Sequence, residues 1–159
     1  MTRKEQYEQL IPQIAGLIKD ETNLIGILSN VSAALHDAFP ERFFWVGFYL
    51  QENGNMLRLG PFQGSVACYV IPFGKGVCGK AWEEGRTLIV PDVEKFPGHI
   101  ACSSLSRSEI VVPMYDDSHT FRGVLDIDST QLNDFNEDDK EGLERIIELL
   151  MAETQDLFQ

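Results

Sequence analysis

The stretch Phe44-Trp45-Val46-Gly47-Phe48-Tyr49-Leu50, followed by Glu52-Asn53-Gly54-Asn55, decides the fold class of this chain. Its side chains fit the two-residue period of a β-strand. The Asn53-Gly54 pair signals a hairpin turn, so Leu57 and Leu59 are expected on a second, antiparallel strand. One face of the first strand should carry Phe44, Val46, Phe48 and Leu50, and the other Trp45, Gly47 and Tyr49.

Long helices are predicted on both sides of this hairpin. Apolar residues at helical spacing predict a helix over about 4–19, a second from Leu24 to before Pro40, and a last one over about 136–156. Between the hairpin and the last helix we expect strands at about 67–72, 87–90, 109–115 and 120–128, a short helix at 76–84, and a long loop at 91–108. This order indicates an α+β fold: an antiparallel sheet of about six strands, with long helices on one face and segments 60–86 and 91–108 covering the other.

Length and composition restrict the class of protein. The chain has 159 residues, of which 43% are hydrophobic, and is expected to form one domain over 1–159. It contains no apolar run of 18 residues and no apolar signal core at its N-terminus, so we expect a cytoplasmic protein that does not span a membrane. A formal net charge of −12 disfavours nucleic acid and anionic lipid as partners.

Two carboxylates in Val124-Leu125-Asp126-Ile127-Asp128 stand out. Alternation places Asp126 and Asp128 on one face of a strand, opposite Leu125 and Ile127, which should face the helices. They could mark a solvent-facing strand end, or a pocket floor that binds an ammonium group or holds a protonated carboxyl. Trp45 and Tyr49 should lie on the same side of the sheet, either as plain core or as an apolar wall of that pocket.

The cysteines Cys68, Cys78 and Cys102 are too far apart for a zinc ribbon or finger. Each could be a small buried hydrophobe. Cys102, however, lies in the long polar loop near His99, where a thiol would be chemically available, and Glu109 could point to the same place. His99 itself could be a solvated loop residue. The G-x-G-x-x-G pattern at 74–79 is interpreted as a turn and helix start, because the hairpin order excludes a parallel dinucleotide-binding sheet.

Several of these stretches together resemble the free methionine-(R)-sulfoxide reductases, a catalytic branch of the GAF-domain fold. The resemblance spans about residues 42–130 and includes all three cysteines. It rests on Trp45-Val46-Gly47-Phe48-Tyr49, Leu59-Gly60-Pro61-Phe62-Gln63-Gly64, Ala67-Cys68, Gly76-Val77-Cys78-Gly79, Gly98-His99-Ile100-Ala101-Cys102, Ser108-Glu109-Ile110 and Gly123-Val124-Leu125-Asp126-Ile127-Asp128-Ser129.

The resemblance implies roles for individual residues. Cys102 would attack the sulfoxide sulfur, Cys68 would resolve the sulfenic acid as a disulfide, and Cys78 would be a third thiol and possible second resolver. The substrate-binding residues would be Trp45, which would pack on the substrate methyl group, Tyr49, Glu109, Asp126 and Asp128.

The same resemblance implies the partners. The substrate would be free methionine sulfoxide, the reductant a dithiol protein such as thioredoxin, and the assembly a homodimer, with neither metal nor organic cofactor. Two other interpretations are retained. One is a non-catalytic GAF module that senses a small molecule or redox state, and the other is a cysteine-based hydrolase with His99 as base.

Overall fold

A single antiparallel sheet organises the chain. The computed structural model describes residues 1–158, so the end of the predicted domain, Gln159, lies outside the described residues. The strands are β1 (Trp45–Glu52), β2 (Met56–Gln63), β3 (Val70–Pro72), β4 (Leu88–Val90), β5 (Ser108–Tyr115) and β6 (Phe121–Ser129). Over the described residues they form one sheet in the order β3-β2-β1-β6-β5-β4, and every neighbouring pair is antiparallel. The α+β, GAF-like fold predicted from the sequence is confirmed.

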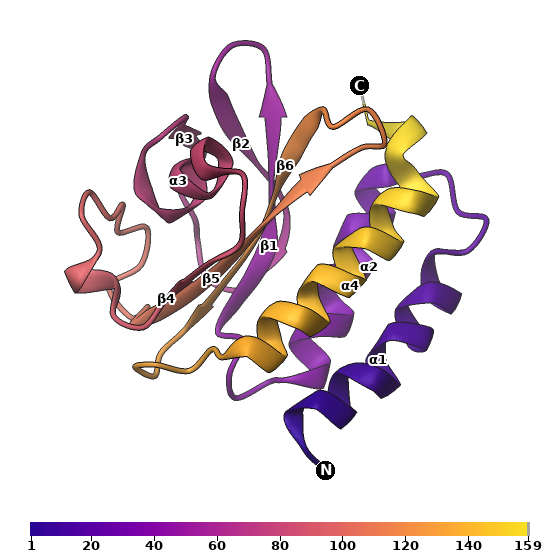
Figure 1. Cartoon of the computed structure of the whole chain (residues 1–159), viewed down its shortest axis with the longest axis horizontal. Helices are drawn as coiled ribbons and strands as arrows, with labels where there is room; N and C mark the ends of the chain where they lie inside the picture. The colour runs from indigo at the N-terminus through magenta and orange to yellow at the C-terminus, as the bar shows by residue number, and fades with distance from the viewer. Residues whose placement is uncertain (159) are drawn as a thin grey trace.

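Three long helices cover one face of this sheet (Figure 1). They are α1 (Arg3–Ile18), α2 (Leu24–Ala38) and α4 (Glu137–Thr154). Val46, Phe48, Leu125 and Ile127 point from the two central strands into the apolar core beneath these helices, and all four are fully buried. Burial of this face supplies most of the hydrophobic stabilisation, since the effect scales with the apolar area removed from water.

One predicted side-chain orientation is wrong. Phe44 was expected on the helix side with Val46, but it packs against the cluster on the opposite face. β1 begins only at Trp45, so Phe44 lies in a bend where strand alternation does not apply. Phe43, one residue earlier, enters the helix-side core instead.

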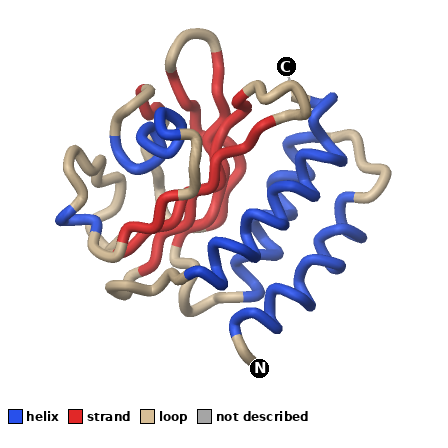
Figure 2. The backbone as a smooth tube through the Cα atoms, in the orientation of Figure 1, coloured by secondary structure: helices blue, strands red, loops and turns tan. Residues whose placement is uncertain are grey.

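Short elements and loops cover the second face (Figure 2). They include the short helix α3 (Gly76–Glu84), the turn η1 (Val93–Lys95) and the connection between β2 and β3. The strand predicted at 67–72 is shorter, because only Val70–Pro72 pairs with β2. The G-x-G-x-x-G stretch forms the turn into α3, as predicted, and not a nucleotide-binding loop in a parallel sheet.

A buried ion cluster fixes the ends of the helices. The Asp139 carboxylate is fully buried at the start of α4. It accepts hydrogen bonds from the Tyr7 hydroxyl at 2.7 Å, from Arg3 at 2.8 Å and from Arg42 at 3.0 Å. These donors come from α1 and from the segment before β1, so one carboxylate joins three parts of the chain.

Replacing this carboxylate should destabilise the fold. We expect Asp139→Ala to lower the free energy of unfolding by about 3–5 kcal/mol, because it removes the buried carboxylate shared by Tyr7 and two arginines and leaves the partly buried Arg42 guanidinium with Asp134 alone. Denaturant unfolding measures this difference. Glu137→Ala, at an exposed position in the same helical turn, is the control and should change stability far less. Equal losses for the two variants would contradict a structural role for the cluster.

Candidate active site

A small pocket lies between the second face of the sheet and its covering loops. Seven of the eight predicted site residues line it, and the eighth, Cys68, is bonded to one of the seven. The seven are Trp45, Tyr49, Cys78, Cys102, Glu109, Asp126 and Asp128. The cavity measures about 40 Å³, and His99 also contributes to its wall.

Strand register brings the three carboxyl groups together. Glu109 of β5 pairs with Asp128 of β6, and Asp128 pairs in turn with Trp45 of β1. Asp126, two residues from Asp128, lies opposite Gly47 on the same side of the sheet. Gly47 itself carries no side chain at this position. The structure places Asp126 and Asp128 around one pocket with Trp45 and Tyr49, and the solvent-facing alternative is wrong.

Burial and mutual repulsion favour the neutral form of these acids. Desolvation, with the charge of Asp128 beside it, raises the pKa of Glu109 to about 8. Desolvation and the neighbouring Glu109 raise the pKa of Asp126 well above its ordinary value, and desolvation and Asp126 do the same for Asp128. The pocket floor therefore holds protonated carboxyl groups near neutral pH.

One carboxylate oxygen of the buried Asp126 has no hydrogen-bond partner among the described residues. Only 5% of the residue is exposed, yet its Oδ1 atom accepts no hydrogen bond from any residue in the described part of the chain. An unpaired buried polar atom is costly, so a group that binds in this pocket gains by meeting it.

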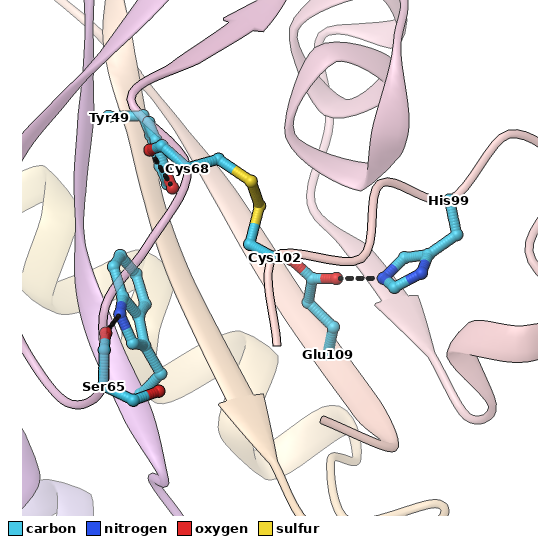
Figure 3. The surroundings of a disulfide bond; sticks show 7 residues. Tyr49, Ser65, Cys68, His99, Cys102 and Glu109 are labelled. Carbon is cyan, nitrogen blue, oxygen red and sulfur yellow. Dashed lines mark hydrogen bonds and ion pairs between the residues drawn. A yellow bond between two sulfur atoms is a disulfide. The ribbon is translucent and has the colours of Figure 1, made fainter. Parts of the chain in front are cut away.

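Trp45 and Tyr49 form the apolar wall and also hold the loop that carries Cys68. The Trp45 indole donates a hydrogen bond to the Ser65 carbonyl, and the Tyr49 hydroxyl donates one to the Cys68 carbonyl, both at 3.0 Å (Figure 3). The two rings stack on one another with centroids 5.9 Å apart. Both aromatic residues therefore connect the pocket wall to the backbone around Cys68.

Cys68 and Cys102 form a disulfide, and both residues are partly exposed (Figure 3). This bond joins the loop after β2 to the loop before β5, beside the pocket that Cys102 lines. The interpretation of either residue as a buried core thiol is wrong. Cys78, by contrast, is a free and buried thiol on α3, and desolvation with the nearby Asp126 raises its pKa well above the ordinary value.

His99 belongs to the pocket, although it was not among the predicted site residues. Its Nε2 atom lies 3.7 Å from a Glu109 carboxylate oxygen, and its side chain is only 16% exposed, so the alternative of a solvated loop residue is wrong. Burial lowers its pKa. The proximity of His99 to Cys102 in the sequence was the available signal, but a loop without periodicity gives no side-chain direction.

Potential metal ligands also meet in this pocket. Single ligand atoms of Cys78, Glu109 and Asp126 all lie within 4.8 Å of one another.

None of the helices in residues 1–158 combines the length and hydropathy needed to cross a bilayer.

Known proteins match this chain in sequence and in fold. The GAF domain family matches residues 21–152. GAF domain-containing protein A of Dictyostelium discoideum is 58% identical, over 94% of this chain and 92% of its own length. The free methionine-R-sulfoxide reductase of Saccharomyces cerevisiae is 43% identical, over 94% of this chain and 86% of its own length. The chain belongs to the free methionine-R-sulfoxide reductase branch of the GAF family.

A solved structure in this family supports the assignment. The X-ray structure of free methionine-R-sulfoxide reductase from Neisseria meningitidis, in complex with its substrate, superposes with a TM-score of 0.93. It is 46% identical, and the match covers 98% of this chain and 92% of that one. The resemblance noted in the sequence is thereby confirmed over both the fold and most of the chain.

The raised pKa of Glu109 predicts how stability depends on pH. Between its ordinary value of about 4.3 and the folded-state value of about 8, the folded protein keeps a proton that the unfolded chain has released. Stability should therefore fall as pH rises through this window. Glu109→Gln removes the effect and should gain a few kcal/mol relative to the parent protein at pH 9 compared with pH 5.

Denaturant unfolding of both proteins at several pH values measures this difference. Glu94→Gln, at an exposed position, is the matched control and should keep the parental pH dependence. A parallel dependence for Glu109→Gln and the parent would show that Glu109 titrates normally.

Proposed function

We propose that this protein reduces the (R)-sulfoxide of free methionine to methionine. The observation that carries the proposal is the pairing of a partly exposed Cys68–Cys102 disulfide with a pocket floor of three acids held largely in their protonated form. The relatives named free methionine-R-sulfoxide reductase support an oxidoreductase of this class.

Substrate recognition follows from the two walls of the pocket. The α-ammonium group would meet the unpartnered Oδ1 of Asp126, while Asp128 and Glu109 complete the acidic floor. The buried indole of Trp45 would pack on the methyl group, with Tyr49 beside it. Three fixed contacts around a chiral sulfur distinguish its two epimers, and the preference for the R form rests on the family.

The chemistry needs a nucleophile and protons. The Cys102 thiolate attacks the sulfoxide sulfur, and the oxygen passes to the cysteine as methionine leaves, which produces a sulfenic acid. The Cys68 thiol then attacks the Cys102 sulfur, forms the disulfide and releases the oxygen as water. In total, one sulfoxide and two thiols give methionine, one disulfide and one water. The protonated carboxyls of the floor are the source of protons for the oxygen.

Recycling requires an external dithiol, and we propose a thioredoxin-type protein. Exchange begins with attack of a thiolate on an accessible disulfide sulfur. The apolar side chains of Val66, Tyr69 and Leu105, on the two loops that the disulfide joins, are 86%, 80% and 59% exposed. They offer a contact surface for such a partner beside the bond that must be reduced.

Cys78 stays a predicted second resolving thiol, supported by its place in the same pocket as Cys102. A homodimer and a cytoplasmic location also stay predictions. A small-molecule sensor leaves the Cys68–Cys102 pair without a task, whereas a redox sensor would use the pair but leaves the acidic pocket floor unexplained. The hydrolase alternative requires His99 as a base for Cys102, whereas the polar contact of His99 is with Glu109.

Two cysteine variants should distinguish the residue that attacks the sulfoxide from the residue that resolves the sulfenic acid. We expect Cys102→Ser to form no methionine, because a serine hydroxyl cannot replace the thiolate at sulfur. Cys68→Ser should still form about one equivalent per site and then stop, because the first oxygen transfer needs no resolving thiol. Quenched-flow product analysis with free methionine sulfoxide measures both. Loss of the single turnover in Cys68→Ser, or its survival in Cys102→Ser, would contradict the assigned roles.

Blocking the substrate's amino group should abolish recognition. If the acids bind an α-ammonium, N-acetylmethionine sulfoxide presents an amide there and leaves buried carboxyl groups unpaired. Sites built around a polar contact reject analogues that lack it by ~10⁴-fold or more, so kcat/KM should fall by that order. Asp126→Asn should lower kcat/KM for the free substrate. The ratio of kcat/KM between the free and the acetylated substrate should therefore become smaller. Similar kcat/KM values for the free and acetylated substrates in the parent protein would exclude the ammonium pocket.

A further inference from the structure

The floor of the pocket has the composition of a metal-binding site. Cys78 comes from α3, Glu109 from β5 and Asp126 from β6, so three separate elements direct one ligand atom each to a common point. These sulfur and oxygen atoms lie within 4.8 Å of one another, and all three residues are buried.

A separate observation indicates that this cluster has room to accept a cation. Asp126 Oδ1 is buried without a hydrogen-bond partner anywhere in residues 1–158. Asp128 adds a further carboxyl to the same floor. Among the pocket-lining residues the only basic side chain is His99, which contacts Glu109 and not Asp126 at ion-pair distance.

We propose that Cys78, Glu109 and Asp126 bind a divalent transition-metal ion of the Zn²⁺ type, with a fourth position open to water. The ion is an inhibitory ligand and not a cofactor, because it occupies the carboxylates that the reductase proposal assigns to the substrate ammonium. The binding itself rests only on the geometry of the pocket floor.

Ligand chemistry selects the kind of ion. Zinc binds cysteine sulfur at about 2.3 Å and carboxylate oxygen at about 2.0–2.2 Å, so neighbouring ligand atoms in a tetrahedral site are about 3.3–3.7 Å apart. The observed cluster therefore needs to contract by about 1.5 Å at most. A thiolate favours zinc or cobalt over the hard ions Mg²⁺ and Ca²⁺. The Cys78 thiol and any protonated carboxyl release their protons to solvent as the metal bonds form.

The size of the cavity also suits an ion. About 40 Å³ is available while Cys68 and Cys102 are disulfide-bonded. One water molecule needs roughly 10–15 Å³ of such a cavity, so a metal ion with one or two bound waters fits. The oxidised protein should therefore bind the metal, and in it Cys78 is the one free thiol of the described chain.

Cobalt titration of the oxidised protein tests this assignment directly. In buffer freed of metals and thiol reductants, Co²⁺ should produce a thiolate-to-cobalt charge-transfer band at one equivalent, and Zn²⁺ should displace it. Cys78→Ser and Cys78→Ala should both lose the band. Removal of outer-shell partners already costs 10–100-fold in metal affinity, so Asp126→Asn and Glu109→Gln should each weaken Zn²⁺ binding by at least about 10-fold.

Glu94→Gln, an exposed acid outside the pocket, is the matched control and should bind Zn²⁺ as the parent does. Circular dichroism verifies that each variant is folded. A parent protein without the band, or a Zn²⁺ affinity that Cys78→Ala leaves unchanged, would overturn the proposal. Because no substrate is present, neither result depends on whether the protein reduces methionine sulfoxide.

Discussion

Three carboxyl groups share the floor of one pocket, and no lysine or arginine lines it. The rest of the site depends on this arrangement. Desolvation and mutual repulsion keep the acids largely protonated, which makes them proton donors, and a cationic group that enters the pocket would favour their charged form. Desolvation, and then the same acids, raise the pKa of the buried Cys78 thiol, so this cysteine is a weak nucleophile until a cation enters the pocket.

Two buried aspartates, Asp139 and Asp126, differ in how fully their carboxylate oxygens are hydrogen-bonded. Asp139 is completely enclosed and receives hydrogen bonds from Tyr7, Arg3 and Arg42, so its charge is compensated within the fold. Asp126 is almost as buried but leaves an oxygen without a donor in the described chain. Burial alone therefore does not separate the two roles, whereas hydrogen-bond satisfaction does. The helix-side core carries most of the apolar burial, so the fold stays stable although Asp126 has an unpaired buried oxygen.

The sequence predicted those parts of the site that follow from strand alternation. Asp126, Asp128, Trp45 and Tyr49 were placed on one face by a period of two, and the structure agrees. Phe44 was misplaced because the strand begins one residue later. The pairing of Glu109 with Asp128 depends on register between strands, and the contact of His99 with Glu109 depends on loop conformation. Neither is encoded in a local pattern. The disulfide and the thiol roles came from family resemblance and not from spacing.

The Cys68–Cys102 disulfide lies where its formation or reduction can affect access to the pocket. Cys68 and Cys102 lie on the two loops that cover the pocket, and Tyr49, a wall residue, donates a hydrogen bond to the backbone of Cys68. With the disulfide formed, the cavity of about 40 Å³ is far below the roughly 300–1,000 Å³ typical of small-molecule sites. In this state the cavity is therefore smaller than the sites that usually hold a small molecule. In the proposed cycle, Cys102 must be a free thiolate to attack the next sulfoxide, so reduction of the disulfide must precede the next turnover.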